Sequence, residues 1–322
     1  MDLSFLEINK LYVIGNGFDR HHDMPCSYDD FKRYLTKYYP EVYANLTRLY
    51  GDINADWWRT FEESLANFNP DKYPKEVADE SFFDQLNELV SRYGQKGRDI
   101  MDQYEVLHKD SPSNKYARAE LMVRFEMMEL KKGLNDAFGS WVKSLKIPDE
   151  SKKLEGINPN ALFFTFNYTR TIEDLYGVDD ELVVHLHGSI DNNVFIIGHN
   201  RTAEEMMNQD LENNVYKRDL DIDSAEDDAR NAMFIAAEDF KKPVEDIIYQ
   251  HRADFNSLDG IKEIEIKGFS YSPIDLPYLE RVLEITGKYI KVIFNWHTEH
   301  DMKNAKNFIQ KEGLTNSELV YF

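Results

Sequence analysis

The sequence of 322 residues contains only one cysteine, Cys26, so the chain cannot form an internal disulfide. This scarcity is typical of proteins in a reducing compartment, and we expect a cytoplasmic protein. No stretch approaches the roughly 18 apolar residues that suggest a membrane span. The first ten residues also lack a basic region followed by an apolar core, so no signal peptide is predicted.

Positive charge is scarce as well. The chain has 38 Lys and Arg residues against 59 Asp and Glu residues, which gives a formal net charge of −21. Such a chain repels nucleic-acid backbones unless a local basic patch intervenes, and no dense Lys/Arg cluster occurs. We therefore do not expect nucleic acid as the main partner. A small nucleotide remains possible, because a glycine turn at a helix N-terminus binds phosphate without net positive charge.

The chain is rich in apolar and aromatic residues, at 42% and 13%, which predicts an ordered globular fold. Short apolar runs followed by Gly, Asn or Ser predict an α/β fold with a Rossmann-like, mostly parallel sheet flanked by helices. We expect a single domain over residues 1–322, with large helical insertions at about 40–147 and about 203–256. The expected strands lie at 11–14, 161–169, 181–190, 194–200, 261–270 and 288–296, and a last apolar run follows at 318–322.

The stretch 11–31 organises this prediction. An apolar strand enters the turn Gly15-Asn16-Gly17 and continues into a helix, an arrangement that often presents backbone N–H groups to phosphate. An ordinary dehydrogenase site needs a third glycine, where this chain has Arg20. It also needs a second strand with an acidic residue about 20 positions on, where this chain continues as a helix. A hydride-transfer site is therefore excluded, whereas a nucleotide site is retained.

Several motifs resemble the AbiH family of bacterial abortive-infection proteins. They occur in the family's order over nearly the whole chain: GNGFD at 15–19 with Ser27, Tyr28 and Phe31 behind it, WWRTFEESL at 57–65, FNYT at 166–169, HLHGSI at 185–190, IIGH at 196–199 and FSYSPIDLPYL at 269–279. The resemblance implies an antiphage function. The Asn, His-Gly and Gly-x-Ser elements are more distantly similar to sirtuin-like domains of antiphage effectors that consume NAD.

The sirtuin-like resemblance implies a site for NAD as substrate, with Asn167 and His187 as the catalytic pair. Cleaving the nicotinamide–ribose bond builds positive charge on the sugar. The Asn167 amide can hold a ribose hydroxyl or a water molecule, and a neutral His187 can act as general base near pH 7. Thr169 stands where sirtuin-like sites usually carry an acidic residue. The residues expected to bind the nucleotide are Gly15, Asn16, Gly17, Phe18, Asp19, Gly188, Gly268, Ser270 and Asp275.

Structural roles compete with these assignments. Asn167 can close a turn, His187 can be a hydrogen-bonded structural residue, and Asp19 can be a first-turn acid favoured by the helix dipole. Asp275 precedes Leu276-Pro277, so a helix N-cap is the favoured interpretation there. His21 and His22 are expected in an exposed loop.

Two other functions remain open. His185 and His187 would lie on one face of a strand, where Asp19, His22 or His199 could complete a metal site of a phosphoesterase or nuclease. Our leading prediction nevertheless contains no metal. The third possibility is a non-catalytic nucleotide sensor whose helical insertions contact a second copy or a partner protein. The aromatic segment 38–68 would then form either an interface or a core.

Overall fold

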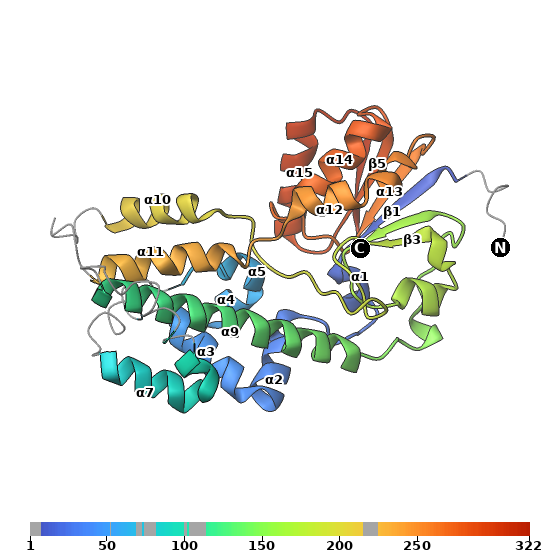
Figure 1. The fold of residues 1–322 in the computed structure, drawn as a ribbon. Coiled ribbons are helices and arrows are strands. Elements are labelled where there is room, and N and C mark those ends of the chain that lie inside the picture. The colour runs from blue at the N-terminus through green and yellow to red at the C-terminus, as the bar shows by residue number, and fades with distance from the viewer. Residues whose placement is uncertain are drawn as a thin grey trace. The chain divides into compact units, whose positions relative to one another are not determined.

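The computed structural model describes residues 8–51, 53–68, 73, 82–99, 102, 114–214 and 225–322. The chain divides into two compact units (Figure 1). The sheet unit comprises Met1–Tyr34, Ala137–Ile197 and Lys242–Phe322, and the helical unit comprises Leu35–Asp136 and Gly198–Lys241. The two predicted insertions thus supply most of one separate helical unit. Within the described ranges, no helix is both long and apolar enough to cross a membrane.

The sheet unit contains six parallel strands in the order β3-β2-β1-β4-β5-β6 (Figure 1). This is the strand order of the doubly wound dinucleotide-binding fold, and it confirms the predicted α/β class. The strands are β1 Lys10–Ile14, β2 Leu162–Thr165, β3 Val183–His185, β4 Glu263–Lys267, β5 Lys291–Trp296 and β6 Ser317–Tyr321.

The strand predicted at 194–200 is wrong. This segment forms no strand; its one bridge joins His199 to Lys241. The Ile196 N–H donates to the His187 carbonyl at 3.0 Å, and the Val194 carbonyl lies against Gly188. The segment therefore folds back on the loop that follows β3 instead of extending the sheet.

Residues of successive strands alternate between two apolar cores. Leu11 and Val13 of β1 face the first core, which is covered by α12 Val244–Gln250, α13 Arg252–Asn256, α14 Leu276–Thr286 and α15 Glu299–Glu312. Tyr12 and Ile14 face the second core, together with residues of the short helix α1 Asn16–His21 and the π-helix η3 Thr171–Leu175. Other helices with residues in the sheet unit include α2 Tyr28–Tyr38, η2 Glu150–Lys152 and η4 Asp180–Leu182. As predicted, Ser27 caps α2 through its hydroxyl, which accepts from the Asp30 N–H at 3.2 Å.

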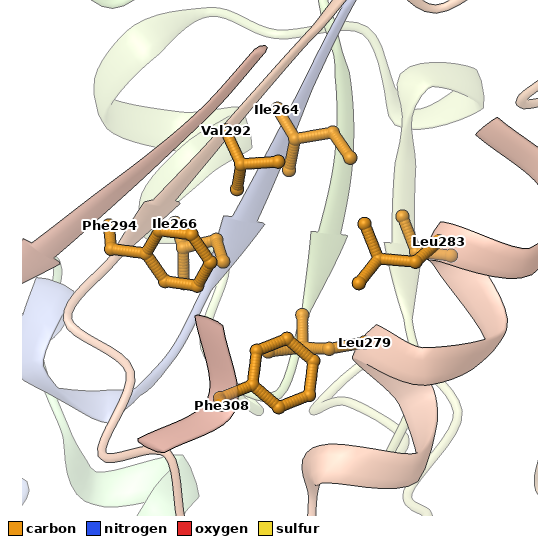
Figure 2. Close-up of a pocket in the computed structure, with 8 residues that line it drawn as sticks. Ile264, Ile266, Leu279, Leu283, Val292, Phe294 and Phe308 are labelled. Carbon is orange, nitrogen blue, oxygen red and sulfur yellow. The ribbon is translucent and has the colours of Figure 1, made fainter. Parts of the chain in front are cut away.

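A small apolar pocket lies in the first core, between strands β4 and β5 and helices α14 and α15 (Figure 2). Its lining consists of Ile264, Ile266, Leu279, Val282, Leu283, Val292, Phe294 and Phe308. Because the lining has no polar side chain, the pocket is a gap in core packing and offers no group that would orient a polar ligand.

The helical unit confirms the predicted helical content of the insertions. Its helices include α3 Pro40–Tyr50, α4 Ala55–Arg59, α5 Phe61–Ser64, α7 Phe82–Tyr93, α9 Asn114–Ser144, α10 Ala203–Asn214 and α11 Ala225–Glu238; α9 continues into the sheet unit. Trp58 and Phe61 are fully buried and stack on each other, so this part of the aromatic segment is core. The buried Glu126 carboxylate is paired with Arg48 and Arg92. Such pairing offsets the cost of burying its charge.

The ends of β1 and β4 meet through glycine backbones. A Cβ at Gly15 would lie 2.6 Å from the Gly268 carbonyl oxygen, and one at Gly17 would lie 2.8 Å from the same atom. A Cβ at Gly268, whose φ is +63°, would overlap the Phe18 backbone nitrogen. The two turns can approach this closely only because all three residues lack a side chain.

We predict that Gly268→Ala destabilises the fold more than Gly313→Ala. Both glycines have nearly the same positive φ, +63° and +66°, but a Cβ at Gly313 meets nothing within 4 Å. In Gly313→Ala, the control, the free energy of unfolding should fall only by the cost of placing alanine in the left-handed region, about 1–2 kcal/mol. Gly268→Ala should lose this amount and, in addition, an overpacking cost of roughly 1–3 kcal/mol. Urea unfolding of both variants measures the difference, and equal losses would contradict the proposed backbone contact.

Candidate functional site

All residues predicted for the nucleotide site lie in the sheet unit, at or near the carboxyl ends of strands β1 to β4. Ligands of doubly wound sheets bind at this edge, close to the point where the strand order reverses. That point lies between β1 and β4. His199, a possible metal ligand in the alternative prediction, belongs instead to the helical unit.

The glycine turn uses most of its amides within the protein. The Gly15 N–H donates to the Lys267 carbonyl at 3.0 Å and the Gly17 N–H to the Gly268 carbonyl at 2.7 Å. The Phe18 N–H donates to the Gly15 carbonyl at 2.9 Å. A phosphate arriving at the turn would compete with these carbonyls for all three N–H groups. The turn therefore has a direct structural function, the joining of β1 to β4.

Asp19 of α1 lies in a buried polar group that we call the Asp19 cluster, formed with Asn167, Thr169 and Thr171 beyond the end of β2. The Thr169 hydroxyl donates to Asp19 Oδ2 at 2.5 Å and lies 3.1 Å from the Thr171 hydroxyl. Asp19 is 1% exposed and Asn167 is 6% exposed. Three buried side-chain atoms of this cluster have no hydrogen-bond partner among the described residues: Asp19 Oδ1, Asn167 Oδ1 and Asn167 Nδ2.

Burial raises the pKa of Asp19 to about 6, although Thr169, Thr171 and the facing Asn167 amide lower it. The carboxyl group therefore changes charge close to neutral pH, as a group that transfers protons must. Met24 and Cys26 lie in the loop between α1 and α2, next to the cluster. The Thr171 hydroxyl contacts the Met24 sulfur at 3.4 Å, and the Asp19 charge helps to raise the pKa of the Cys26 thiol, after burial.

His185 supports the backbone of Asn167. One ring nitrogen, Nδ1, lies 2.8 Å from the Asn167 carbonyl oxygen, and Nε2 lies 2.9 Å from the Glu173 carboxylate. Burial alone would lower the pKa of His185, but the hydrogen bond and charge of Glu173 raise it overall. Arg170 holds the same region through ion pairs with Asp180 at 2.8 Å and Glu173 at 3.8 Å. These contacts fix η3 and the backbone of Asn167 in place.

His187 lies in a second polar group, the His187 cluster, with Tyr278, Asp275 and Lys242. Its Nε2 is 3.2 Å from the Tyr278 hydroxyl and 3.7 Å from Asp275 Oδ1. The Lys242 ammonium group pairs with Asp275 Oδ1 at 3.3 Å, and Phe166 packs against the imidazole. Burial, followed by the charges of Lys242 and His251, lowers the pKa of His187 well below its ordinary value. The imidazole is therefore neutral at pH 7.

The predicted catalytic pair is divided between the two clusters. Phe166 and His187 contact Tyr278, which belongs to the first core, whereas Asn167, the next residue after Phe166, faces Asp19 of α1. The alternation of side chains along an extended chain accounts for this division. Asn167 is thus brought together with Asp19, and His187 with Asp275.

The remaining predicted nucleotide-binding residues have diverse surroundings. Asn16 is exposed and its amide donates to the Cys26 carbonyl at 2.9 Å, while Phe18 is fully buried in the second core. Gly188 has a φ of +84° and is packed against Val194. Ser270 is exposed, and its carbonyl accepts from the Asn304 amide at 3.4 Å.

Asp275 occupies the N-cap position of α14 without forming a side-chain capping bond, and its carboxylate pairs with Lys242 instead. The predicted N-cap position is therefore confirmed, although the side chain does not act as the cap. Lys242 and Tyr278 were not predicted as site residues. Lys242 follows a helix in a loop, with no local pattern that indicates its burial, and Tyr278 matches ordinary helical core spacing.

The predicted convergence of histidines is also wrong. His185 and His187 have different partners, Glu173 and Tyr278. His22, expected in an exposed loop, is buried between the Phe18 carbonyl at 2.6 Å and the Tyr176 hydroxyl at 2.7 Å. No three His, Cys, Asp or Glu residues of the described ranges are grouped as metal ligands. These positions therefore give no support to the metal-dependent alternative.

We predict that Asp19→Asn stabilises the protein at pH 8 but not near pH 4. The folded state binds the Asp19 proton more tightly than the unfolded chain does, because the pKa rises from 3.8 to about 6. The free energy of unfolding therefore falls as pH increases across this interval. At about 1.4 kcal/mol per pKa unit, the loss is roughly 2–3 kcal/mol. Melting temperatures of both proteins from pH 4 to 8 test this; curves that stay parallel would contradict it.

Comparison with known proteins identifies the family. None of the curated proteins compared with the chain is significantly similar to it. A protein-family model described as "Bacteriophage abortive infection AbiH" matches residues 11–296. The match spans both glycine turns, the Asp19 cluster and the His187 cluster. The chain therefore belongs to the AbiH family of bacteriophage abortive-infection proteins.

Proposed function

We propose that this AbiH protein binds a nucleotide at the carboxyl edge of its sheet and hydrolyses NAD⁺ to nicotinamide and ADP-ribose. The observation that carries the proposal is the set of three buried polar atoms of Asp19 and Asn167 that have no hydrogen-bond partner among the described residues. Asp19 follows β1 and Asn167 follows β2 in the chain, and the sheet has the strand order of dinucleotide-binding folds.

The unpartnered atoms favour a ligand with several hydroxyl groups. Each buried polar atom without a hydrogen bond costs about 1–3 kcal/mol. The two oxygens accept hydrogen bonds and the Asn167 nitrogen donates them, so together they match a sugar hydroxyl or water, which both donates and accepts. Binding such a ligand would recover the lost hydrogen bonds. Because Asp19 and Asn167 are buried, entry of such a ligand requires the side chains around them to move.

The chemistry of N-glycosidic cleavage suits this environment. Bond breaking develops positive charge on the ribose, and a nearby carboxylate stabilises such charge. Nicotinamide carries positive charge in NAD⁺ and leaves as a neutral molecule, so the protein mainly has to orient the ribose and a water molecule and accept one proton. Asn167 would orient the ribose or the water. The neutral imidazole of His187 is one candidate for the base, as the resemblance to sirtuin-like domains implies.

We predict that purified wild-type protein releases nicotinamide and ADP-ribose from NAD⁺, and that Asn167→Ala lowers the rate by about 10²-fold or more, as loss of an orienting group does. Chromatography of the products measures this. Asn307→Ala is the matched control, since Asn307 is exposed on α15 and belongs to neither polar cluster.

The same assay separates the alternatives. Absence of turnover under all conditions, including extracts of infected cells as activator, would reject hydrolysis. Stabilisation by NAD⁺ without turnover would then favour a sensor. Loss of activity in EDTA with recovery in Zn²⁺ or Mn²⁺ would favour a metal-dependent enzyme.

A further inference from the structure

We propose that Asp19, and not His187, is the base that accepts the proton of the attacking water, and that His187 is a positioning residue. The inference deepens the proposed function and rests on it. It follows from the contacts that each side chain makes and from which of their atoms remain free.

The protein orients the Asp19 carboxylate through one of its two oxygens and leaves the other without a hydrogen bond within the described part of the chain. Oδ2 accepts from the Thr169 hydroxyl at 2.5 Å, which fixes the plane of the carboxylate, while Oδ1 has no partner among the described residues. A general base needs this combination, one atom that is held and one that is available to the proton. The surrounding burial also brings the pKa of Asp19 to about 6, so the carboxylate is mostly ionised at pH 7 and can still bind a proton.

Asn167 is the neighbour that such a base requires. Its amide faces Asp19 and lowers the pKa of that carboxyl, and its oxygen has no hydrogen-bond partner among the described residues. Its backbone is fixed through His185. The amide oxygen can accept from a water molecule or a ribose hydroxyl whose other proton points to Asp19 Oδ1. Asp19 and Asn167 therefore offer a matched pair of buried acceptors at the ends of adjacent strands.

His187 lacks these properties. Its Nε2 already faces the Tyr278 hydroxyl at 3.2 Å, and its ring is enclosed by Phe166 and Tyr278. The nearby Lys242 ammonium group opposes protonation of the imidazole, and burial opposes it still more. Uptake of a proton by His187 would therefore place a second positive charge in the His187 cluster. The ring is better suited to holding Tyr278 and the start of α14 in place.

The proposed step balances as follows. The bond between the ribose C1′ and the nicotinamide nitrogen breaks, and its electron pair leaves with nicotinamide, which becomes neutral. The oxygen of water forms the new bond to C1′. One proton of that water passes to Asp19 Oδ1 and then to solvent, so that NAD⁺ and water give nicotinamide, ADP-ribose and one proton. No oxidant, reductant or metal is needed.

Nicotinamide release by wild-type protein, Asp19→Asn, His187→Gln and the control Asp23→Asn, measured from pH 4.5 to 8.5, tests this assignment. Asp23 is a neighbouring exposed acid paired with Lys152, and asparagine tolerates its φ of +60°. We expect wild-type kcat/KM to rise with pH through about 6, because the base must be ionised. Asp19→Asn should lose about 10²–10⁴-fold in kcat and also lose this pH dependence.

The other variants and a binding measurement complete the test. His187→Gln should lose less kcat than Asp19→Asn and should keep the rise of kcat/KM near pH 6. Asp23→Asn should have the kcat and the pH dependence of the wild type. ADP-ribose should still raise the melting temperature of Asp19→Asn, which shows that the variant is folded and binds. If Asp19→Asn keeps wild-type turnover, or if His187→Gln alone removes the pH dependence, the assignment of the base is wrong although hydrolysis stands. If wild-type protein never cleaves NAD⁺, the proposed function and the inference fail together.

Discussion

The direct contact between two glycine turns is the constraint on which the site depends. Gly15 and Gly17 pack on the Gly268 backbone, and the Gly17 N–H donates to the Gly268 carbonyl. This contact joins β1 to β4 at the position where the strand order reverses, which is where doubly wound sheets bind ligands. It also sets the direction in which α1 leaves the sheet, and therefore where Asp19 lies. The glycine motif therefore contributes to the site mainly by allowing the close backbone contact that positions α1 and Asp19.

Two polar clusters share the edge of the sheet because extended chains alternate their side chains. Phe166 is directed to the first core, so Asn167 is directed to Asp19 and away from His187. The Asp19 cluster retains unpartnered atoms, whereas Asp275 links Lys242 and His187 in the other cluster. Unpartnered buried groups cost stability, and proteins tolerate this cost where the groups serve a ligand. Because of this difference, we assign proton transfer to the Asp19 cluster and a positioning role to the His187 cluster.

The match to the AbiH family of bacteriophage abortive-infection proteins includes this edge of the sheet. The match covers β1 to β5, both clusters and the helical unit, and it ends before β6. Each proposed role therefore concerns residues within the matched region. The acidic surface implied by the net charge of −21 is compatible with a small nucleotide bound at buried polar groups, since no basic surface is then needed.

The sequence by itself determined the α/β class with a Rossmann-like, mostly parallel sheet, five of the six expected strands and the helical content of the insertions. The strand expected at 194–200 does not form, and the last apolar run forms β6. These features arise from local periodicity and from turn residues, which short segments carry without their neighbours. Family membership was likewise visible in the order of the motifs, and the match confirmed it. Only the tertiary structure decided that Asn167 faces Asp19, that Lys242 is buried against Asp275 and that His185 and His187 have different partners. Those facts depend on contacts between residues far apart in the chain, and no local pattern contains them.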